Sequence, residues 1–455
     1  MNRRSFLKVS TMAMTSAILQ TSVSAKPKDR PNVVVILVDD LGYGDLGCMG
    51  AADMRTPRID ALAARGMRFD QFYANCPVCS PTRAALLTGC FPDKVGVPGV
   101  IRTHRENSWG RLAPEATLLP AVLSEAGYHT AIVGKWHLGL TEPDTPNDRG
   151  FDFFHGFLGD MMEDYRNHRR HDVNYMRRDR ETIDPEGHAT EIFTQWAIDY
   201  VRPRAAEKDP FFLYLAYNAP HDPIQPPEAW VRRVKEREPG ISDKRAELVA
   251  FVEHLDDGIG KFLDGLDDAG LTDNTLVIFA SDNGGHLHFG ANNGPLNGSK
   301  GDMFEGGIRV PACAAWPGHI PEGRVSHTLL MTMDLFPTVC EACGAVSPED
   351  IDGRSFLGEL LGGPADTSER TLVWVRREGG PRYGGRAYYA IRQGDWKLLQ
   401  NDPFSPMQLF NLHDDPREAK PLDTTHKQYR PLFDRLRQHV NEAGVVPWQR
   451  AATPR

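Results

Sequence analysis

The segment 76–90, CPVCSPTRAALLTGC, gathers three cysteines and an arginine, and cysteine is the most nucleophilic side chain in proteins. Three interpretations are open. Cys76 and Cys79 could form a redox-active CxxC pair, although no thioredoxin-like unit surrounds them. They could be structural cysteines, buried or disulfide-bonded. Alternatively, Cys79 could be a reactive centre at the start of a helix.

The residues after Cys79 favour the third interpretation. Ser80 can cap a helix and Pro81 can open one that runs through AALLTG. Cys79 would then lie at the positive end of the helix dipole, with Arg83 one turn further on. Such a place suits chemistry on an anion.

Polar residues of ligand type follow two apolar runs that are typical of buried parallel strands. Asp39 and Asp40 follow NVVVILV (32–38), whereas Asp282 and Asn283 follow TLVIFA (275–280). Their side chains offer oxygen ligands only, which favours Ca²⁺ or Mg²⁺ over Zn²⁺. Taken singly, each pair could also be an ordinary strand-end turn.

Two further apolar runs end in basic residues. Lys135 and His137 follow HTAIV (129–133), and His221 follows FFLYLAY (211–217). Helical patterns at 117–126 and 246–269 separate the runs. Strands that alternate with helices predict an α/β fold, with a large, mostly parallel sheet flanked by helices. Ligands bind beyond the carboxyl ends of such strands, so we expect these residues to meet at one site.

Five segments, taken together, resemble the signatures of the formylglycine-dependent (type I) sulfatases. They are Asp39-Asp40, CSPTRAALLTG (79–89), GYHTAIVGKWH (127–137), SDNGG (281–285) and GSKGDMFEGGIRVP (298–311). The resemblance spans residues 30–340, with weaker similarity near 408–418; Thr82 stands where serine is commoner. It implies an alkaline phosphatase-like fold and hydrolysis of a sulfate ester.

The resemblance also implies roles for individual residues. A formylglycine-generating or maturase enzyme would oxidise Cys79 to formylglycine, whose hydrated diol would attack sulfur. Asp39, Asp40, Asp282, Asn283 and the modified Cys79 would bind Ca²⁺, with Mg²⁺ left open by composition. Arg83, Lys135 and Lys300 would hold the sulfate. His137 would hold the diol and, in the second half-reaction, take its proton, and His221 would protonate the leaving oxygen.

The arginine-rich segment 164–180, DYRNHRRHDVNYMRRDR, is either a solvated loop or a rim that grips an anionic glycan. The predicted rim residues are Arg102, His104, Arg105, Arg166, His168, Arg169, His286 and His288, with Arg376 and Arg377 as possible additions from the C-terminal part. The expected substrate is a sulfated carbohydrate or polysaccharide fragment.

Two rival functions are open. One is a phosphonate or phosphate ester hydrolase on the same scaffold. The other is a non-catalytic sulfoglycan-binding protein with an unmodified Cys79. A zinc-dependent alkaline phosphatase is disfavoured, because its nucleophile would be Ser or Thr and its metal ligands would include more histidine.

Composition and length bound these interpretations. The chain has 455 residues and a formal net charge of −9, which argues against a nucleic-acid binder. Residues 1–25 contain NRRSFLK, an apolar stretch and a small-residue end, so they resemble a bacterial twin-arginine export signal. The signal implies an export machinery as partner and a periplasmic or secreted protein. No other apolar run is long enough to span a membrane.

A change in the sequence pattern near residue 365 predicts two further regions. Residues 26–365 would form the catalytic domain, and residues 366–455 a smaller α+β subdomain. The latter has strand patterns at 371–377, 387–393, 395–400 and 407–412, typical of an antiparallel meander, and a helix near 427–443. Cys340 and Cys343 have metal-like spacing but no second pair, which favours a structural role on a helix.

Overall fold

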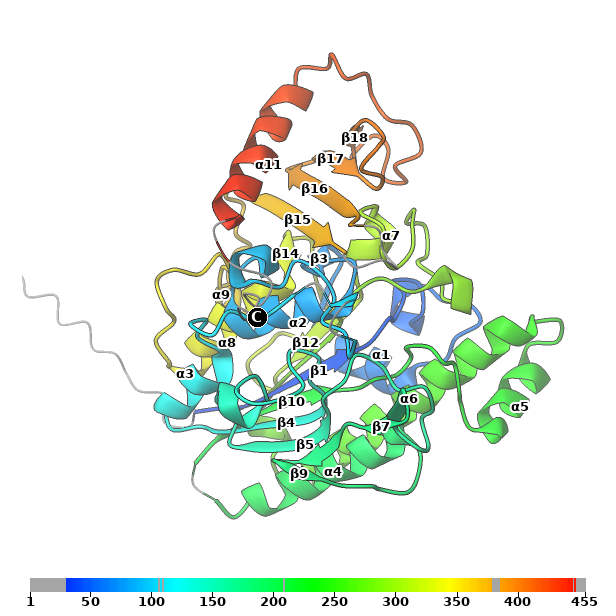
Figure 1. Cartoon of the computed structure of the whole chain (residues 1–455). Helices are drawn as coiled ribbons and strands as arrows, with labels where there is room; N and C mark the ends of the chain where they lie inside the picture. Colours follow the sequence, from blue (N-terminus) through cyan, green and yellow to red (C-terminus); the bar gives the residue numbers. More distant parts are fainter. Residues whose placement is uncertain are drawn as a thin grey trace, which may run out of the picture.

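A ten-stranded sheet forms the centre of the molecule (Figure 1). The computed structural model describes residues 30–444 and 446, apart from 105, 106, 109, 208 and 379–384. The predicted export signal, residues 1–25, lies outside the described residues. The strands, in spatial order, are β13 (Arg324–Ser326), β2 (Met67–Phe69), β12 (Ala312–Ala315), β11 (Thr275–Ser281), β1 (Asn32–Val38), β10 (Phe211–Ala216), β4 (His129–Lys135), β5 (Phe153–Phe157), β8 (Met176–Arg178) and β9 (Glu181–Thr182).

The five strands at the centre of the sheet, β11, β1, β10, β4 and β5, are all parallel. Antiparallel strands β12 and β8 flank this block on its two sides. The predicted mostly parallel sheet is therefore confirmed. Because parallel strands end at the same edge, the residues after β11, β1, β10 and β4 meet there.

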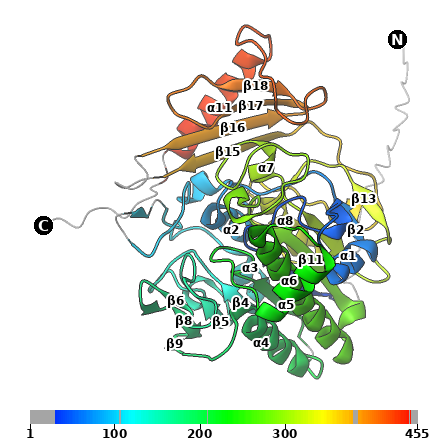
Figure 2. The same cartoon turned by 90° about the vertical axis from the view of Figure 1, so that its right-hand side faces the viewer.

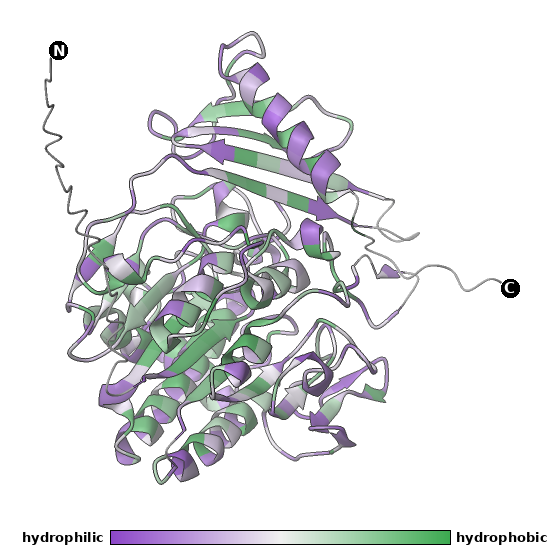
Figure 3. Ribbon diagram, turned by 90° about the vertical axis from the view of Figure 1, so that its left-hand side faces the viewer, coloured by the Kyte–Doolittle hydropathy of each residue, from purple (hydrophilic) through white to green (hydrophobic). Residues whose placement is uncertain are grey.

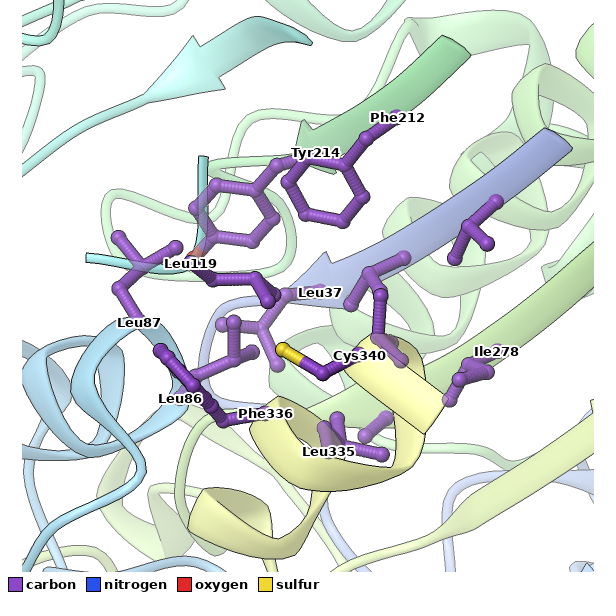
Figure 4. Close-up of a cluster of buried hydrophobic side chains, with 14 of the residues drawn as sticks. Leu37, Leu86, Leu87, Leu119, Phe212, Tyr214, Ile278, Leu335, Phe336 and Cys340 are labelled. Atoms are coloured by element: carbon purple, nitrogen blue, oxygen red, sulfur yellow. The ribbon is translucent and has the colours of Figure 1, made fainter. Parts of the chain in front are cut away.

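The apolar β1 strand is buried on both faces, because its alternating side chains enter two different cores. Val33, Val35 and Leu37 pack with α2 (Cys79–Thr88), α3 (Leu119–Glu125) and α8 (Leu335–Cys343). Figure 4 shows this core, with Leu86 and Leu87 of α2 opposite Phe336 and Cys340 of α8. Val34 and Ile36 pack against the other layer of helices. That layer consists of α1 (Pro57–Ala64), α4 (Ala189–Arg204), α5 (Glu228–Arg237) and α6 (Asp243–Asp268).

The C-terminal part forms a separate antiparallel sheet, as predicted. Its strands follow the chain order β15 (Thr371–Arg377), β16 (Ala387–Gln393), β17 (Trp396–Gln400) and β18 (Gln408–Asn411). Helix α11 (Tyr429–Ala443) lies across one face of this sheet (Figure 2). Figure 3 shows hydrophilic residues along the outer side of α11, whereas Leu432 and Leu436 are buried against the sheet.

The C-terminal sheet and the larger part share one hydrophobic core. Trp374 of β15 packs with Tyr73 and with Met303 and Ile308, which flank or belong to helix α7 (Glu305–Ile308). Within the described residues, no helix combines the length and apolar composition needed to cross a bilayer. The domain limits at residues 25 and 365 stay predictions.

Candidate active site

The ends of β1 and β11 bring four oxygen-bearing side chains together. The two strands pair in register up to Val38 and Ser281, and the Asp282 N–H donates to the Val38 carbonyl at 3.0 Å. Asp39, Asp40, Asp282 and Asn283 therefore leave the sheet side by side. All four are at most 3% exposed.

Two oxygen atoms of this group lack a hydrogen-bond partner among the described residues although they are buried, namely Asp39 Oδ1 and Asn283 Oδ1. The Asn283 amide nitrogen donates to Asp40 Oδ1 at 2.8 Å, so the amide oxygen of Asn283 points away from that carboxylate oxygen. Buried oxygens without donors are costly unless a cation binds them. The donor set therefore fits a hard divalent ion such as Ca²⁺.

Cys79 is the first residue of helix α2, so the helix begins two residues earlier than Pro81 would predict. Ser80 is not the cap: its hydroxyl accepts the Ile101 N–H at 3.1 Å, because Ser80 already lies inside the helix. Ligand atoms of Cys79, Asp39, Asp40 and His221 all lie within 4.8 Å of one another. The helix N-terminus thus faces the oxygen cluster.

Three cations balance the three carboxylates. Arg83 contacts Asp282 at 2.6 Å and Asp39 at 3.5 Å, Lys135 pairs with Asp39, and Lys300 contacts Asp40 at 2.7 Å. Burial raises the pKa of Asp39, but Lys135, His221 and Arg83 together hold it well below its ordinary value. Asp39 is thus ionised and available to a cation.

Glycine lets β4 deliver Lys135. Gly134 has φ +108°, and a Cβ there would lie 1.9 Å from the Ala216 carbonyl oxygen of the neighbouring strand β10. Any larger residue would push the two strands apart. Close packing at Gly134 therefore sets the depth at which Lys135, fully buried, meets Asp39.

The two predicted histidines present one nitrogen each to the site. His137 has Nε2 2.8 Å from the Ile101 carbonyl, while its buried Nδ1 has no partner among the described residues. Burial, with Lys135 and Arg83, lowers the pKa of His137 well below its ordinary value. The ring is therefore neutral, with Nδ1 as an acceptor. His221 Nδ1 lies 2.6 Å from the Asp222 carbonyl, and Nε2 lies 3.7 Å from Asp40.

A cavity of about 480 Å³ opens over this cluster, a size within the usual range for small-molecule sites. Cys79, His137, His221 and Lys300 line its floor together with residues of several loops. The other lining residues are Val78, Val100, Arg102, Asp160, Met161, Arg170, Asp222, His286, Gly301 and Arg376.

The predicted rim is only partly brought to this cavity. Arg102 and His286 line it, as does Arg376. The His104 ring contacts the His171 ring in a tilted arrangement, with centroids 4.2 Å apart. Arg105 lies outside the described residues. The remaining predicted rim residues, Arg166, His168, Arg169 and His288, are not among the lining residues of the described chain.

His168 and Arg169 have other structural roles. His168 is fully buried, with Nε2 3.1 Å from the Gly187 carbonyl, so the expectation that it reaches substrate is wrong. Arg169 makes a bidentate pair with Asp184 away from the cavity. Sequence reasoning missed Asp160 and Arg170, although Arg170 lies within the arginine-rich segment.

The C-terminal sheet contributes to the cavity wall. Arg376, near the end of β15, donates to the Gly301 carbonyl at 2.6 Å, next to Lys300. Glu378, 1% exposed, accepts from Arg376 at 3.2 Å and from Arg102 at 2.8 Å. Glu378 thus links the C-terminal sheet to the loop of Arg102, and Arg376 links it to the loop of Lys300.

All seven cysteines are free thiols, including Cys76 and Cys79. The structure therefore gives no support to a disulfide in the CxxC segment. Cys76 points away from the cavity, with its sulfur 3.5 Å from the Val375 carbonyl. Cys340 and Cys343 both lie on helix α8 and are buried in the core, as expected for a structural role.

Comparisons with known proteins agree with this arrangement. A sulfatase family model matches residues 31–345, and a model of the C-terminal region of N-sulphoglucosamine sulphohydrolase matches residues 299–445. N-acetylgalactosamine-6-sulfatase of the dog is 34% identical, over 92% of this chain and 87% of the relative; the pig protein is 37% identical over the same shares. A solved structure described as Ps i-CgsB in complex with k-i-k-neocarrahexaose is 30% identical, covers 93% of this chain and 95% of that chain, and superposes with a TM-score of 0.84.

Proposed function

Because this chain belongs to the sulfatase family, we propose that it removes a sulfate group from a sulfated carbohydrate. It is a sulfuric ester hydrolase with an alkaline phosphatase-like fold, as the sequence motifs predict. Support for a sugar substrate comes from its similarity to N-acetylgalactosamine-6-sulfatase and to a structure bound to a neocarrahexaose.

The observation that carries the proposed site is the convergence of Cys79 with Asp39, Asp40 and His221 on the floor of one cavity. Asp39, Asp40, Asp282 and Asn283 would hold Ca²⁺, which neutralises sulfate charge when bound. Formylglycine at position 79 would supply the nucleophilic oxygen. Both groups fit the residues present: the unpartnered oxygens suit the ion, and the helix N-terminus suits an oxyanion.

The remaining steps belong to side chains of this chain. Lys135 and Lys300 supply fixed positive charge, which stabilises a sulfate in transfer more than in the resting ester. Neutral His137 would hold the nucleophile through its Nδ1, unpartnered within the described chain, and would accept a proton there in the second half-reaction, when sulfate leaves. His221, held by the Asp222 carbonyl through Nδ1, donates a proton from Nε2 to the departing sugar oxygen.

Cys79→Ala should abolish turnover, with kcat lowered by roughly three orders of magnitude or more, because the nucleophile is lost. Cys76→Ala is the matched control, because Cys76 is also buried and lies three residues away, but its sulfur contacts Val375 instead of the cavity. Hydrolysis of 4-nitrophenyl sulfate beside the phosphate and phosphonate analogues measures both activity and ester preference.

Three outcomes would contradict the proposal. A Cys79→Ala variant with full activity would exclude this nucleophile. A preference for the phosphonate or phosphate ester would favour the rival hydrolase. An intact Cys79 thiol in the active protein, seen by peptide mass spectrometry, would exclude formylglycine.

We also propose that the chain is exported after maturation. Residues 1–25 support this by their paired arginines, apolar stretch and small-residue end. Partners would then be a formylglycine-generating or maturase enzyme and the bacterial twin-arginine export machinery. Replacing Arg3 and Arg4 by lysine should retain the protein in the cytoplasm, and fractionation of cells measures this.

A further inference from the structure

We propose that Asp160 and Arg170 form a sugar-recognition pair, which binds neighbouring hydroxyl groups of the sugar that carries the sulfate ester. The inference rests on the proposed function, because it assigns a substrate contact within the same cavity. The two residues line that cavity above the floor made by Cys79, His221 and Lys300. They would determine which sugar is bound, whereas the residues of the floor would act on the sulfate group.

A short hairpin places Arg170 in the cavity wall. Strands β6 (Arg169–Arg170) and β7 (Val173–Asn174) pair antiparallel, joined by His171 and Asp172. Successive residues of a strand point to opposite faces. Arg169 accordingly pairs with Asp184 outside the cavity, whereas Arg170 pairs with Asp160 inside it.

The hairpin turn is held in an unfavourable backbone conformation. His171 has φ +49° and Asp172 has φ +59°, the left-handed region that a two-residue turn of this type requires and that glycine or asparagine normally fills. Strained backbone of this kind persists only where its surroundings hold it. Here Glu163 does so, accepting the His171 N–H at 2.9 Å and Arg170 Nη1 at 3.0 Å.

The same contacts fix the Arg170 side chain. Its Nε donates to Asp160 Oδ1 at 3.0 Å, and its Nη2 lies 3.5 Å from Asp160 Oδ2. Asp160 Oδ1 also accepts the Met161 N–H at 2.9 Å. With 8% and 15% of their side chains exposed, Asp160 and Arg170 are pre-arranged before any ligand arrives.

The pair matches the hydrogen-bonding pattern of a sugar. A sugar hydroxyl can donate to Asp160 Oδ2, which receives only the long contact from Arg170 within the described part of the chain. A neighbouring hydroxyl can accept an N–H from the guanidinium, whose five donors exceed the three that these contacts use. Because Asp160 and Glu163 both contact Arg170, the pair offers no net positive charge to the sulfate and contacts the sugar ring instead.

Substrates with and without a sugar separate recognition from chemistry. We expect Asp160→Asn and Arg170→Gln to lower kcat/KM about 10- to 100-fold on a sulfated sugar, the loss expected for hydrogen bonds to a charged group. The probes are N-acetylgalactosamine 6-sulfate and a sulfated neocarrahexaose. On 4-nitrophenyl sulfate, which has no sugar hydroxyls, both variants should keep wild-type kcat/KM.

The matched controls lie on the same hairpin. Arg169→Gln and Asp184→Asn remove the neighbouring ion pair outside the cavity and should leave both activities unchanged. The double variant Asp160→Asn/Arg170→Gln keeps the local charge balance, so it guards against a single variant that fails to fold. Its thermal midpoint is measured beside its kinetics.

Several results would overturn the inference. Equal losses on the sugar and aryl substrates would mean that the pair only supports the cavity wall. If the wild type cleaves the sugars and the variants cleave them with unchanged kcat/KM, the pair does not touch substrate. A wild-type enzyme that cleaves the aryl sulfate but neither sugar would also contradict it. By contrast, a wild-type enzyme inactive on every sulfate ester would contradict the proposed function itself.

Discussion

Asp39 Oδ1 and Asn283 Oδ1 are buried oxygens without a hydrogen donor in the described part of the chain. The three carboxylates of the site, Asp39, Asp40 and Asp282, each already contact a basic side chain through another oxygen. A divalent ion would satisfy both oxygens at once. Metal binding should therefore contribute to the stability of the fold as well as to activity.

The variant Asn283→Ala, which removes one of the two unpartnered oxygens, tests whether metal binding stabilises the fold. Ca²⁺ should raise the thermal midpoint of the wild type, by the equivalent of about 2.7 kcal/mol at a hundredfold excess over Kd. The variant should lose most of that shift, because one ligand oxygen is gone. Differential scanning calorimetry with Ca²⁺, Mg²⁺ or a chelator measures it.

Asn293→Ala is the control for Asn283→Ala. Asn293 is buried in the same region, but its oxygen already accepts the Gly285 N–H at 2.9 Å. Its variant should be less stable and yet keep the full Ca²⁺ response. An unchanged Ca²⁺ response in Asn283→Ala would exclude Asn283 as a ligand.

The sequence pointed to the residues of the floor but to only part of the wall, namely Arg102, His286 and Arg376. Cys79, Lys135 and Lys300 lie in segments that resemble sulfatase signatures, so the sequence points to them. Asp160 and Arg170 carry no motif. Their placement depends on which of two adjacent arginines faces inward, and a strand of two residues has no periodicity from which to read this.

Helix α4 begins with an unusual N-cap residue, the histidine His188. His188 Nδ1 accepts the Thr190 N–H at 3.2 Å, and Nε2 lies 3.0 Å from the Gln225 carbonyl, so the neutral ring suits both contacts. The ring also stacks on Tyr165, whose hydroxyl donates to the His221 carbonyl at 2.9 Å. The cap thus supports the loop that carries the proposed proton donor.

This cap predicts acid sensitivity. Burial lowers the pKa of His188 to about 4, below the roughly 6.5 of an unfolded histidine. The unfolded chain therefore binds more protons between these values, and stability falls as pH drops from 6.5 towards 4, by about 2–3 kcal/mol for this group. His188→Asn keeps a capping oxygen without the titration and should flatten the slope.

Urea unfolding at several pH values between 4.5 and 7 measures the slope. His413→Asn, an exposed histidine of the C-terminal sheet region, is the control and should leave the slope unchanged. An equally steep slope in His188→Asn would assign the acid sensitivity to other groups.

Element prediction succeeded where apolar runs were long. The pattern at 32–38 coincides with β1, and those at 371–377 and 387–393 coincide with β15 and β16. The short strands β2 and β13 were missed, because three residues with mixed polarity give no pattern. The start of α2 was placed two residues late, because Ser80 and Pro81 are good cap residues but tertiary contacts set the boundary.

A buried ion network joins the two parts of the molecule. Lys397 of β17, fully buried, contacts Glu305 at 2.9 Å and Glu418 at 2.7 Å. Burial raises the pKa of Glu305, but Lys397 and Arg392 hold it down at about 2. Glu305 begins α7, five residues after Lys300, so the network anchors the loop of a proposed catalytic residue to the C-terminal sheet.

Lys397→Met should destabilise the whole protein by about 3–5 kcal/mol, because it removes the cation that buried Glu418 contacts at 2.7 Å and the nearest cation of buried Glu305. Lys420→Met, at an exposed position nearby, should change stability by less than about 0.5 kcal/mol. Guanidinium unfolding monitored by fluorescence measures both. Equal stability of the two variants would mean that the buried ion network does not stabilise the contact between the C-terminal sheet and the larger part of the molecule.

The strand order has a consequence for synthesis. β1 is made first, yet its partners β10 and β11 begin at residues 211 and 275. At about 5–20 residues per second, translation takes on the order of ten to thirty seconds to reach β10. Throughout that interval the run NVVVILV has no strand to pair with and is exposed to aggregation. Shielding of this segment in the nascent chain should therefore favour correct folding of the enzyme.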